Sequence, residues 1–140
     1  MALPKHIQLQ IVSADRSLVN EQVDEVEIPG ADGYFGVLPG HTPMLALLGA
    51  GELWYRQGQE KHYLMLAFGF AEVQPDRVTL LAEIAEPAAE IDLPRAEAAR
   101  KRAEERLMAP SADINPERAR IALLKSLIRI QVAARAVTRA

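Results

Sequence analysis

The residues best suited to chemistry in the first half of the chain lie in "GVLPGHTPML", residues 36–45, where glycine and proline surround His41. A nucleophilic site needs a serine or cysteine beside a base and a third group that orients the base. The chain has no cysteine, and its serines lie outside any strand–serine–helix elbow. The histidines, His6, His41 and His62, lack metal-ligand spacing. We therefore predict no catalytic residue and no metal site, and we expect the His41 imidazole to bond a nearby carbonyl in a turn.

The same region and the residues just before it contain four glycines, Gly30, Gly33, Gly36 and Gly40. A phosphate-binding loop would carry a Lys-Ser/Thr pair and would open a helix, whose N-terminus attracts the phosphate. The sequence "GADGYFGVLPG" has neither the pair nor a helical pattern after it. We expect these glycines to allow positive φ angles in tight turns, and we expect "GVLPGHTPML", residues 36–45, to form a shaped surface loop.

The chain around this stretch alternates between apolar and polar residues over short runs. In "HIQLQIV", residues 6–12, isoleucine and leucine alternate with glutamine, and "RVTLLAEIA", residues 77–85, shows the same period of two. Gly/Pro-rich turns separate such runs, and no long helical pattern lies between them. This order predicts antiparallel strands in a sandwich or a barrel rather than βαβ units.

Strong helix formers follow in "DLPRAEAARKRAEERLMA", residues 92–109. Asp92 is a suitable N-cap, and Pro94 is tolerated in the first helical turn. After a short linker, a second helix is expected to start at Asn115-Pro116, with Asn115 as its N-cap. The predicted packing faces are Ala96, Ala99, Ala103 and Leu107 on the first helix, and Leu123, Leu127, Ile130, Ala134 and Val137 on the second. Two helices joined in this way predict an antiparallel helical hairpin.

The formal net charge of −3 is unevenly distributed. Residues 1–92 hold 5 Lys/Arg and 14 Asp/Glu, a net of −9, whereas residues 93–140 hold 11 and 5, a net of +6. The basic second helix is a solvated face, a nucleic-acid interface or a surface that docks onto an acidic protein. The acidic chain and its aromatic content of 5% disfavour nucleic acid, so we favour docking onto an acidic protein surface.

Targeting signals are not evident in the sequence. The start "MALPKHIQLQIV" has no apolar segment after a basic start, and no apolar run approaches the roughly 20 residues of a membrane span. The absence of cysteine gives no indication of an oxidising compartment. We therefore expect a soluble, cytoplasmic protein.

Three motifs, taken together, are similar to those of the epsilon subunit of bacterial F-type ATP synthase, called delta in mitochondria. They are "GADGYFGVLPGHTPML", "AFGFAEVQPDRVTLLAEIA" and "IDLPRAEAARKRAEERL". The resemblance implies an α+β fold, with an N-terminal antiparallel β-sandwich over residues 1–88 and a C-terminal antiparallel helical hairpin over residues 89–140. It implies a non-catalytic rotor subunit of the proton-translocating enzyme, held at the cytoplasmic face of the bacterial membrane only through the complex.

The resemblance also implies partners and the residues that face them. The partners are the gamma subunit, the membrane c-ring and the alpha/beta catalytic head. The residues expected to face the ring and stalk are Asp32, Gly33, Tyr34, Phe35, Gly40 and His41. In this family the extended hairpin inhibits ATP hydrolysis through basic residues of its last helix. Here these would be Arg118, Lys125, Arg129 and Arg135.

Some bacterial members of the family bind ATP as a regulatory ligand through the motif I-D-x-x-R-A. No cofactor is required for their stalk role. Matching positions here are Glu86, Ile91, Asp92, Arg95, Ala96, Lys125 and Arg129. Lys125 replaces an arginine of the family pattern, and a lysine lacks the planar fork that grips phosphate. The alternative is that Asp92 only caps the helix and Arg95 is only a surface charge.

Two functions of other classes remain as alternatives to the rotor subunit. One is a small stand-alone enzyme that uses His41, which would need a second convergent polar group. The other is a nucleic-acid-binding module that uses the basic helix, which would show a salt-dependent association with DNA.

Overall fold

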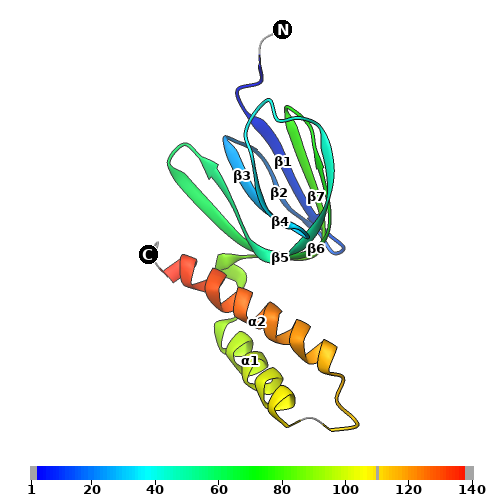
Figure 1. The fold of residues 1–140 in the computed structure, drawn as a ribbon. Helices are drawn as coiled ribbons and strands as arrows, with labels where there is room; N and C mark the ends of the chain where they lie inside the picture. The colour runs from blue at the N-terminus through cyan, green and yellow to red at the C-terminus, as the bar shows by residue number, and fades with distance from the viewer. Residues whose placement is uncertain (1–2, 110, 138–140) are drawn as a thin grey trace. The chain divides into compact units, whose positions relative to one another are not determined.

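Alternating apolar residues build the strands of the first half of the chain. The computed structural model describes residues 3–109 and 111–137, without the side chain of residue 137. Its contacts divide the chain into two units, Met1–Pro87 and Ala88–Ala140. The strands of the first unit are β1 (Ile7–Ser13), β2 (Ser17–Val23), β3 (Glu25–Gly30), β4 (Gly33–Val37), β5 (Met44–Gln57), β6 (Glu60–Val73) and β7 (Arg77–Pro87) (Figure 1).

These strands form one sheet in the order β2-β1-β7-β6-β5-β3-β4, which closes into a sandwich. The predicted α+β fold, a sandwich followed by a helical hairpin, is confirmed. One pairing differs from the expected antiparallel arrangement, because β1 and β7 run parallel. No hairpin joins these two strands, since all the other strands lie between them in the chain, and their direction is therefore not fixed by a turn.

A seam crosses the three long strands, β5, β6 and β7, at Gly49, Phe68 and Glu83. Side chains an even number of residues apart share a face of a strand. Consecutive core residues across the seam are Leu48 and Leu53 on β5, Leu66 and Ala71 on β6, and Ala82 and Ala85 on β7. The two residues of each pair lie an odd number of residues apart. All three strands therefore exchange their inner and outer faces at the seam.

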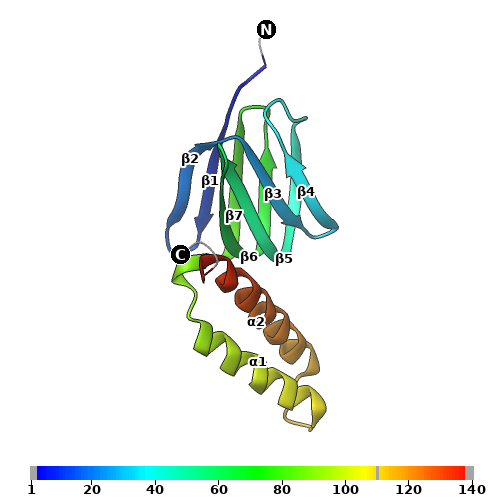
Figure 2. The ribbon, with the colours of Figure 1, turned by 90° about the vertical axis from the view of Figure 1, so that its left-hand side faces the viewer.

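The seam lets a single sheet enclose a core from both sides. Pairing stays in register across it, since Leu48 pairs with Gly69 and Gly69 with Ala82 before the seam. Beyond the seam, Ala50 pairs with Ala67. The residues turned inward on its two sides belong to one hydrophobic cluster. The two layers of the sandwich are therefore continuous strands folded over. Figure 2 shows the strands of this unit from a second side.

The backbone at the seam is unusual. Phe68 has a φ of 62° and Gly69 a φ of 121°. A left-handed conformation costs a residue with a Cβ atom about 1–2 kcal/mol. At Gly69 no side chain is possible, because a Cβ there would collide with the carbonyl oxygen of Leu81. The fold therefore requires glycine at position 69, and it tolerates strain at position 68.

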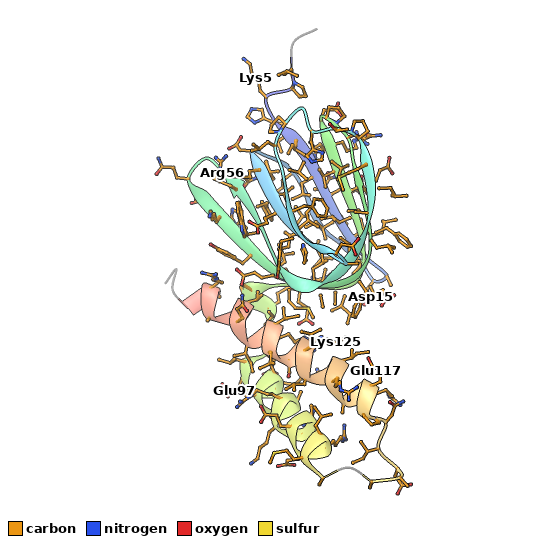
Figure 3. All side chains as sticks on the ribbon, in the orientation of Figure 1. Lys5, Asp15, Arg56, Glu97, Glu117 and Lys125 are labelled. Carbon is orange, nitrogen blue, oxygen red and sulfur yellow. The ribbon has the colours of Figure 1, made fainter. Side chains whose placement is uncertain are left out.

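The second unit contains a 3-10 turn (Ala88–Glu90) and two helices, α1 (Leu93–Met108) and α2 (Pro116–Val137). Both predicted N-caps are confirmed. The Arg95 backbone N–H donates to Asp92 Oδ1 at 3.1 Å, and the Glu117 N–H donates to Asn115 Oδ1 at 3.0 Å. Figure 3 labels Glu117 in the first turn of α2.

Small side chains are buried on both helices. Ala96 and Ala103 of α1 are buried, as predicted, and so are Ala119 and Ser126 of α2. The predicted stripe on α2 is wrong, because Leu127 is 46% exposed and Ala134 is exposed. The Val137 side chain lies outside the described residues. α2 has apolar residues on more than one side, so spacing alone does not select the buried one. Small residues let the two helix backbones approach closely.

Candidate docking surface

The stretch around His41 is partly strand and partly loop. Gly33, Tyr34 and Phe35 lie in β4, which pairs with β3 through a short turn that includes the exposed Asp32. The expectation of a surface loop over residues 36–45 is therefore wrong at both ends, because residues 36–37 belong to β4 and residues 44–45 to β5. The pairing partners of these strands are not revealed by the local sequence. The connection from β4 to β5 spans only residues 38–43.

His41 and Gly40 serve this connection as turn residues. The His41 Nδ1 atom lies 2.6 Å from the carbonyl oxygen of Thr42, as expected of an imidazole that bonds a nearby carbonyl. Gly40 has a φ of 87°, and its N–H donates to the Pro75 carbonyl at 2.8 Å. Among the described residues, no group of three or more His, Asp or Glu side chains is arranged to hold a metal ion.

Tyr34 ties the β3–β4 turn to β5. The Glu52 backbone N–H donates to the Tyr34 hydroxyl at 3.1 Å. The hydroxyl lies so close to Gly51 that a Cβ there would collide with it. At this point the pairing of β3 with β5 is irregular. The Tyr34 hydroxyl accepts a hydrogen bond from a β5 backbone N–H group that a carbonyl oxygen of a neighbouring strand would accept in a regular sheet. The turn that carries Asp32 is therefore tied to β5 by the side chain of Tyr34.

A row of exposed apolar side chains crosses the outer face of β5, β6 and β7. Leu47 pairs with Phe70, and Phe70 pairs with Leu81. Their exposed fractions are 60%, 52% and 54%, and that of Leu45, on the same face, is 74%. We call Leu45, Leu47, Phe70 and Leu81 the outer patch. Contiguous apolar surface of this kind marks interaction sites on soluble proteins.

Sequence reasoning missed the outer patch. The one available signal was an apolar residue at a position where alternation predicts a polar one, such as Leu81 directly after the buried Leu80. Exposed carboxylates accompany the patch, since Glu72 pairs with Leu45 and Glu83 lies on the seam two residues beyond Leu81. The surface is therefore apolar with an acidic border, which favours a partner surface that is apolar and bordered by basic groups.

A carboxylate fastens the β5–β6 turn to the start of β3. Asp24 Oδ2 accepts a 2.7 Å hydrogen bond from the Gly58 N–H, and Asp24 Oδ1 lies 3.0 Å from His6 Nδ1. The Gly58 hydrogen bond, followed by the bond to His6, holds the pKa of Asp24 below its ordinary value of 3.8. Arg56, labelled near this turn in Figure 3, lies 3.7 Å from Asp24 Oδ2 and also bonds Glu25 at 3.1 Å.

Comparison with known proteins decides the family. The model of the ATP synthase delta/epsilon chain β-sandwich domain matches residues 6–88, and that of the delta/epsilon chain long α-helix domain matches residues 89–134. The chain belongs to the ATP synthase delta/epsilon family. It is 42% identical over 131 residues to the ATP synthase epsilon chain of Solibacter usitatus, covering 94% of this chain and 98% of that relative. It is 46% identical to the epsilon chain of Syntrophobacter fumaroxidans, with the same coverage.

A solved structure supports the fold. A chain in the mitochondrial ATP synthase of Euglena gracilis, in an assembly of OSCP, F1 and c-ring, matches with a TM-score of 0.72. The match covers 99% of this chain and 84% of that chain at 24% identity. As a member of the delta/epsilon family, the chain is a subunit of ATP synthase and thus a peripheral part of a membrane-bound complex. The enzyme and nucleic-acid alternatives have no support.

The basic residues that the delta/epsilon resemblance singles out lie on α2. The spacing of Arg118, Lys125 and Arg129 puts them on one face of the helix, and Arg135 lies off that face. Arg118 and Arg135 are exposed, whereas Lys125, labelled in Figure 3, and Arg129 are half-buried. Among the described residues, no helix is long and apolar enough to cross a membrane.

The residues that match the nucleotide motif of the family belong to two units. Glu86 lies near the end of β7 in the first unit. In the second, Asp92 caps α1, Arg95 is exposed in its first turn, and Ala96 is buried. Ile91 is half-buried ahead of the cap. The cap bond shows that Asp92 has a structural role, and nucleotide binding by these residues stays a prediction.

Proposed function

We propose that the chain is the non-catalytic rotor subunit that couples ring rotation to the catalytic head at the cytoplasmic face of a bacterial membrane. Membership of the delta/epsilon family supports this role. The observation that carries the proposal is the outer patch, an exposed apolar surface on a sandwich whose two layers are continuous strands. Such a body is suited to holding a partner in a fixed orientation.

The partner proposed for the outer patch is the gamma subunit of the central stalk. Truncating a well-buried aromatic anchor at an interface typically costs 2 kcal/mol or more, about thirtyfold in affinity. We expect Phe70→Ser or Leu47→Ser to weaken binding of the full chain to gamma by about tenfold or more. Leu3→Ser, which changes a leucine that is 78% exposed outside the outer patch, is the matched control. Unchanged gamma binding by the Phe70 and Leu47 variants would refute this assignment.

The ring is the partner proposed for the β3–β4 turn and for the Gly40–His41 turn. The chain contains no cysteine, so a single introduced cysteine gives a clean crosslinking site. In the assembled enzyme we expect Asp32→Cys to form a disulfide with a cysteine placed in the polar loop of the ring subunit. Gln59→Cys, in the exposed β5–β6 turn, is the control. Crosslinking that is equally efficient at both positions would contradict a specific ring-facing role.

The hairpin is proposed to restrain ATP hydrolysis through its basic residues and the acidic surface of the alpha/beta head. We expect replacement of Arg118, Lys125, Arg129 and Arg135 by glutamine to raise ATP hydrolysis by the assembled enzyme. The control removes the same charge at four exposed cations elsewhere in the hairpin, Lys101, Arg102, Arg106 and Arg120. Equal stimulation by both sets would show a general effect of charge instead of a docking contact.

ATP is proposed as a regulatory ligand of the hairpin. Support comes from the motif, with Arg95 exposed one helical turn from Asp92. Asp92→Asn separates the two roles of this residue, because asparagine caps helices as well as aspartate does but lacks the charge. We expect the variant to keep its helicity and to lose affinity in a calorimetric ATP titration. An unmodified chain that fails to bind at millimolar ATP would refute the proposal.

A further inference from the structure

The β3–β4 turn, residues 30–33, lies directly against β5. The Ala31 backbone N–H donates to the Leu47 carbonyl at 2.9 Å. A Cβ atom at Gly49 would lie 2.8 Å from the Gly30 carbonyl oxygen, closer than real Cβ atoms approach. Glycine in a strand often marks such a close approach of another backbone. The first half of the turn is therefore fastened to β5 on the side of the seam that carries Leu47.

Tyr34 fastens the other half of the turn to β5, beyond the seam. Its partner on β3 is Pro29, which has no N–H group, and the pairing of β3 with β5 is irregular here. The phenol reaches past β3, and its hydroxyl accepts the bond from the Glu52 N–H at 3.1 Å. Gly51 leaves the room for this, because a Cβ atom there would collide with the hydroxyl oxygen. Glu52 is only 7% exposed, so little water is available to replace the hydroxyl.

Strand β5 is shared by the two surfaces proposed to bind other subunits. Leu45 and Leu47 of the outer patch, the surface proposed for gamma, lie on β5. The turn that carries Asp32, proposed to face the ring, is bonded to the same strand at Leu47 and at Glu52. A turn attached at one point of a strand can pivot about it, whereas attachment at two points fixes its direction.

We propose that Tyr34 is a positioning residue, whose hydroxyl holds the ring-facing turn at a fixed angle to β5 and thus to the surface that binds gamma. The hydroxyl acts through the backbone of β5 and does not itself touch the ring. This inference rests on the proposed contacts of the turn with the ring and of the outer patch with gamma. Its added content is that one side-chain hydrogen bond keeps the two contacts in a fixed relation.

Two variants test the bond in the full chain. Tyr34→Phe keeps the aromatic side chain and leaves the Glu52 N–H without its acceptor. We expect the amide hydrogens of Glu52 and of residues 31–33 to exchange about tenfold faster, as for the loss of one hydrogen bond. Gly51→Ala displaces the phenol from the other side and should have the same effect. Tyr63→Phe, which removes a hydroxyl from β6, is the matched control.

The position of the turn is measured in the assembled enzyme by the crosslink of Asp32→Cys to the ring. We expect Tyr34→Phe to slow the formation of this crosslink severalfold, at a temperature well below the melting temperature of the variant. ATP-driven proton pumping should also fall relative to the rate of ATP hydrolysis, because the turn follows the ring less closely. Tyr63→Phe should change neither quantity.

The outcomes distinguish this inference from the proposed function. If Asp32→Cys crosslinks to the ring equally fast with and without Tyr34→Phe, the ring contact stands and the positioning role is refuted. Unchanged amide exchange at Glu52 would refute that role as well. If Asp32→Cys forms no crosslink while Tyr34 is present, the ring contact is wrong and this inference with it. If Tyr63→Phe slows the crosslink as much as Tyr34→Phe, the effect is one of general stability and Tyr34 has no positioning role.

Discussion

The sandwich and the hairpin are stabilised by side chains of different size. Ile7, Leu9 and Leu80 are among the large residues that fill the sandwich core with no exposed surface. The described part of the hairpin buries mainly small side chains, such as Ala103 and Ser126, and with them Ile128 and Val132 of α2. Burying a large aliphatic side chain contributes about 1.5–3 kcal/mol, against about 0.8 kcal/mol for each CH₂ group. Large side chains therefore dominate the core of the sandwich, whereas the hairpin is stabilised by fewer large residues, by small residues and by helix caps.

This contrast implies that equally small chemical changes have unequal effects in the two units. Trp54, the single tryptophan of the chain, lies in β5 and reports on the sandwich by fluorescence. Far-UV circular dichroism near 222 nm reports mainly on the helices. The two signals allow the units to be followed separately in the same sample.

The largest effect is expected from a cavity in the sandwich core. Leu66→Ala removes a fully buried side chain and should lower the free energy of unfolding by about 2–5 kcal/mol. Urea unfolding followed by Trp54 fluorescence measures it. The control Leu3→Ala, at an exposed position, should change stability by less than about 0.5 kcal/mol. A similar small value for Leu66→Ala would contradict the description of the core.

Overpacking of the hairpin should have the next largest effect. Ala103 is buried, and a larger side chain there would force the two helices apart. Ala103→Leu is expected to destabilise the hairpin by about 1–3 kcal/mol. Helical circular dichroism should melt earlier while the Trp54 transition is unchanged. Ala98→Leu, at an exposed position of α1, is the control. If the Trp54 fluorescence transition shifted to lower temperature by the same amount, the two units would not unfold separately.

Removal of a helix cap should have a smaller effect on stability. The Asn115 side chain accepts hydrogen bonds from the Glu117 and Arg118 N–H groups. Asn115→Ala should destabilise α2 by about 1 kcal/mol, whereas Asn115→Asp should retain the cap. Amide hydrogen exchange in the first turn of α2 measures the difference. If alanine and aspartate gave the same exchange rates, the cap would not be contributing.

The smallest effect should be a change in how the stability of the sandwich depends on pH. Because the pKa of Asp24 is lowered in the folded state, its contribution is present above the ordinary value of 3.8 and is lost as the pH falls through the folded pKa. Asp24→Asn should therefore melt below the unmodified chain at neutral pH, and the two melting temperatures should converge in acid. If the difference between the two melting temperatures stays constant with pH, the charge of Asp24 does not cause the loss of stability.

The sequence predicted those structural elements that depend on residues close to one another in the chain. The alternation of Val78, Leu80 and Ala82 predicted their common buried face, and Asp92 and Asn115 predicted the helix starts. Each of these predictions depends on residues within a few positions of one another, where backbone geometry alone fixes which side chains meet.

Features set by distant pairing were not predictable in the same way. Strand β4 exists because Gly33–Val37 finds β3 as a partner, and its glycines favoured a loop. The outer patch escaped notice because the exchange of faces at the seam makes the solvent side of β5 and β6 look like core sequence. The parallel β1–β7 pair joins the two ends of the first unit, whose approach no local pattern encodes.

The seam also bears on how the sandwich responds to load. In a sandwich of two separate sheets, the layers are held together by side-chain packing and by the loops that connect them. Here β5, β6 and β7 pass from one layer into the other through Gly49, Phe68 and Glu83. A twisting force applied to one layer is therefore carried into the other by the covalent backbone of three strands, whose pairing keeps the same register on both sides of the seam.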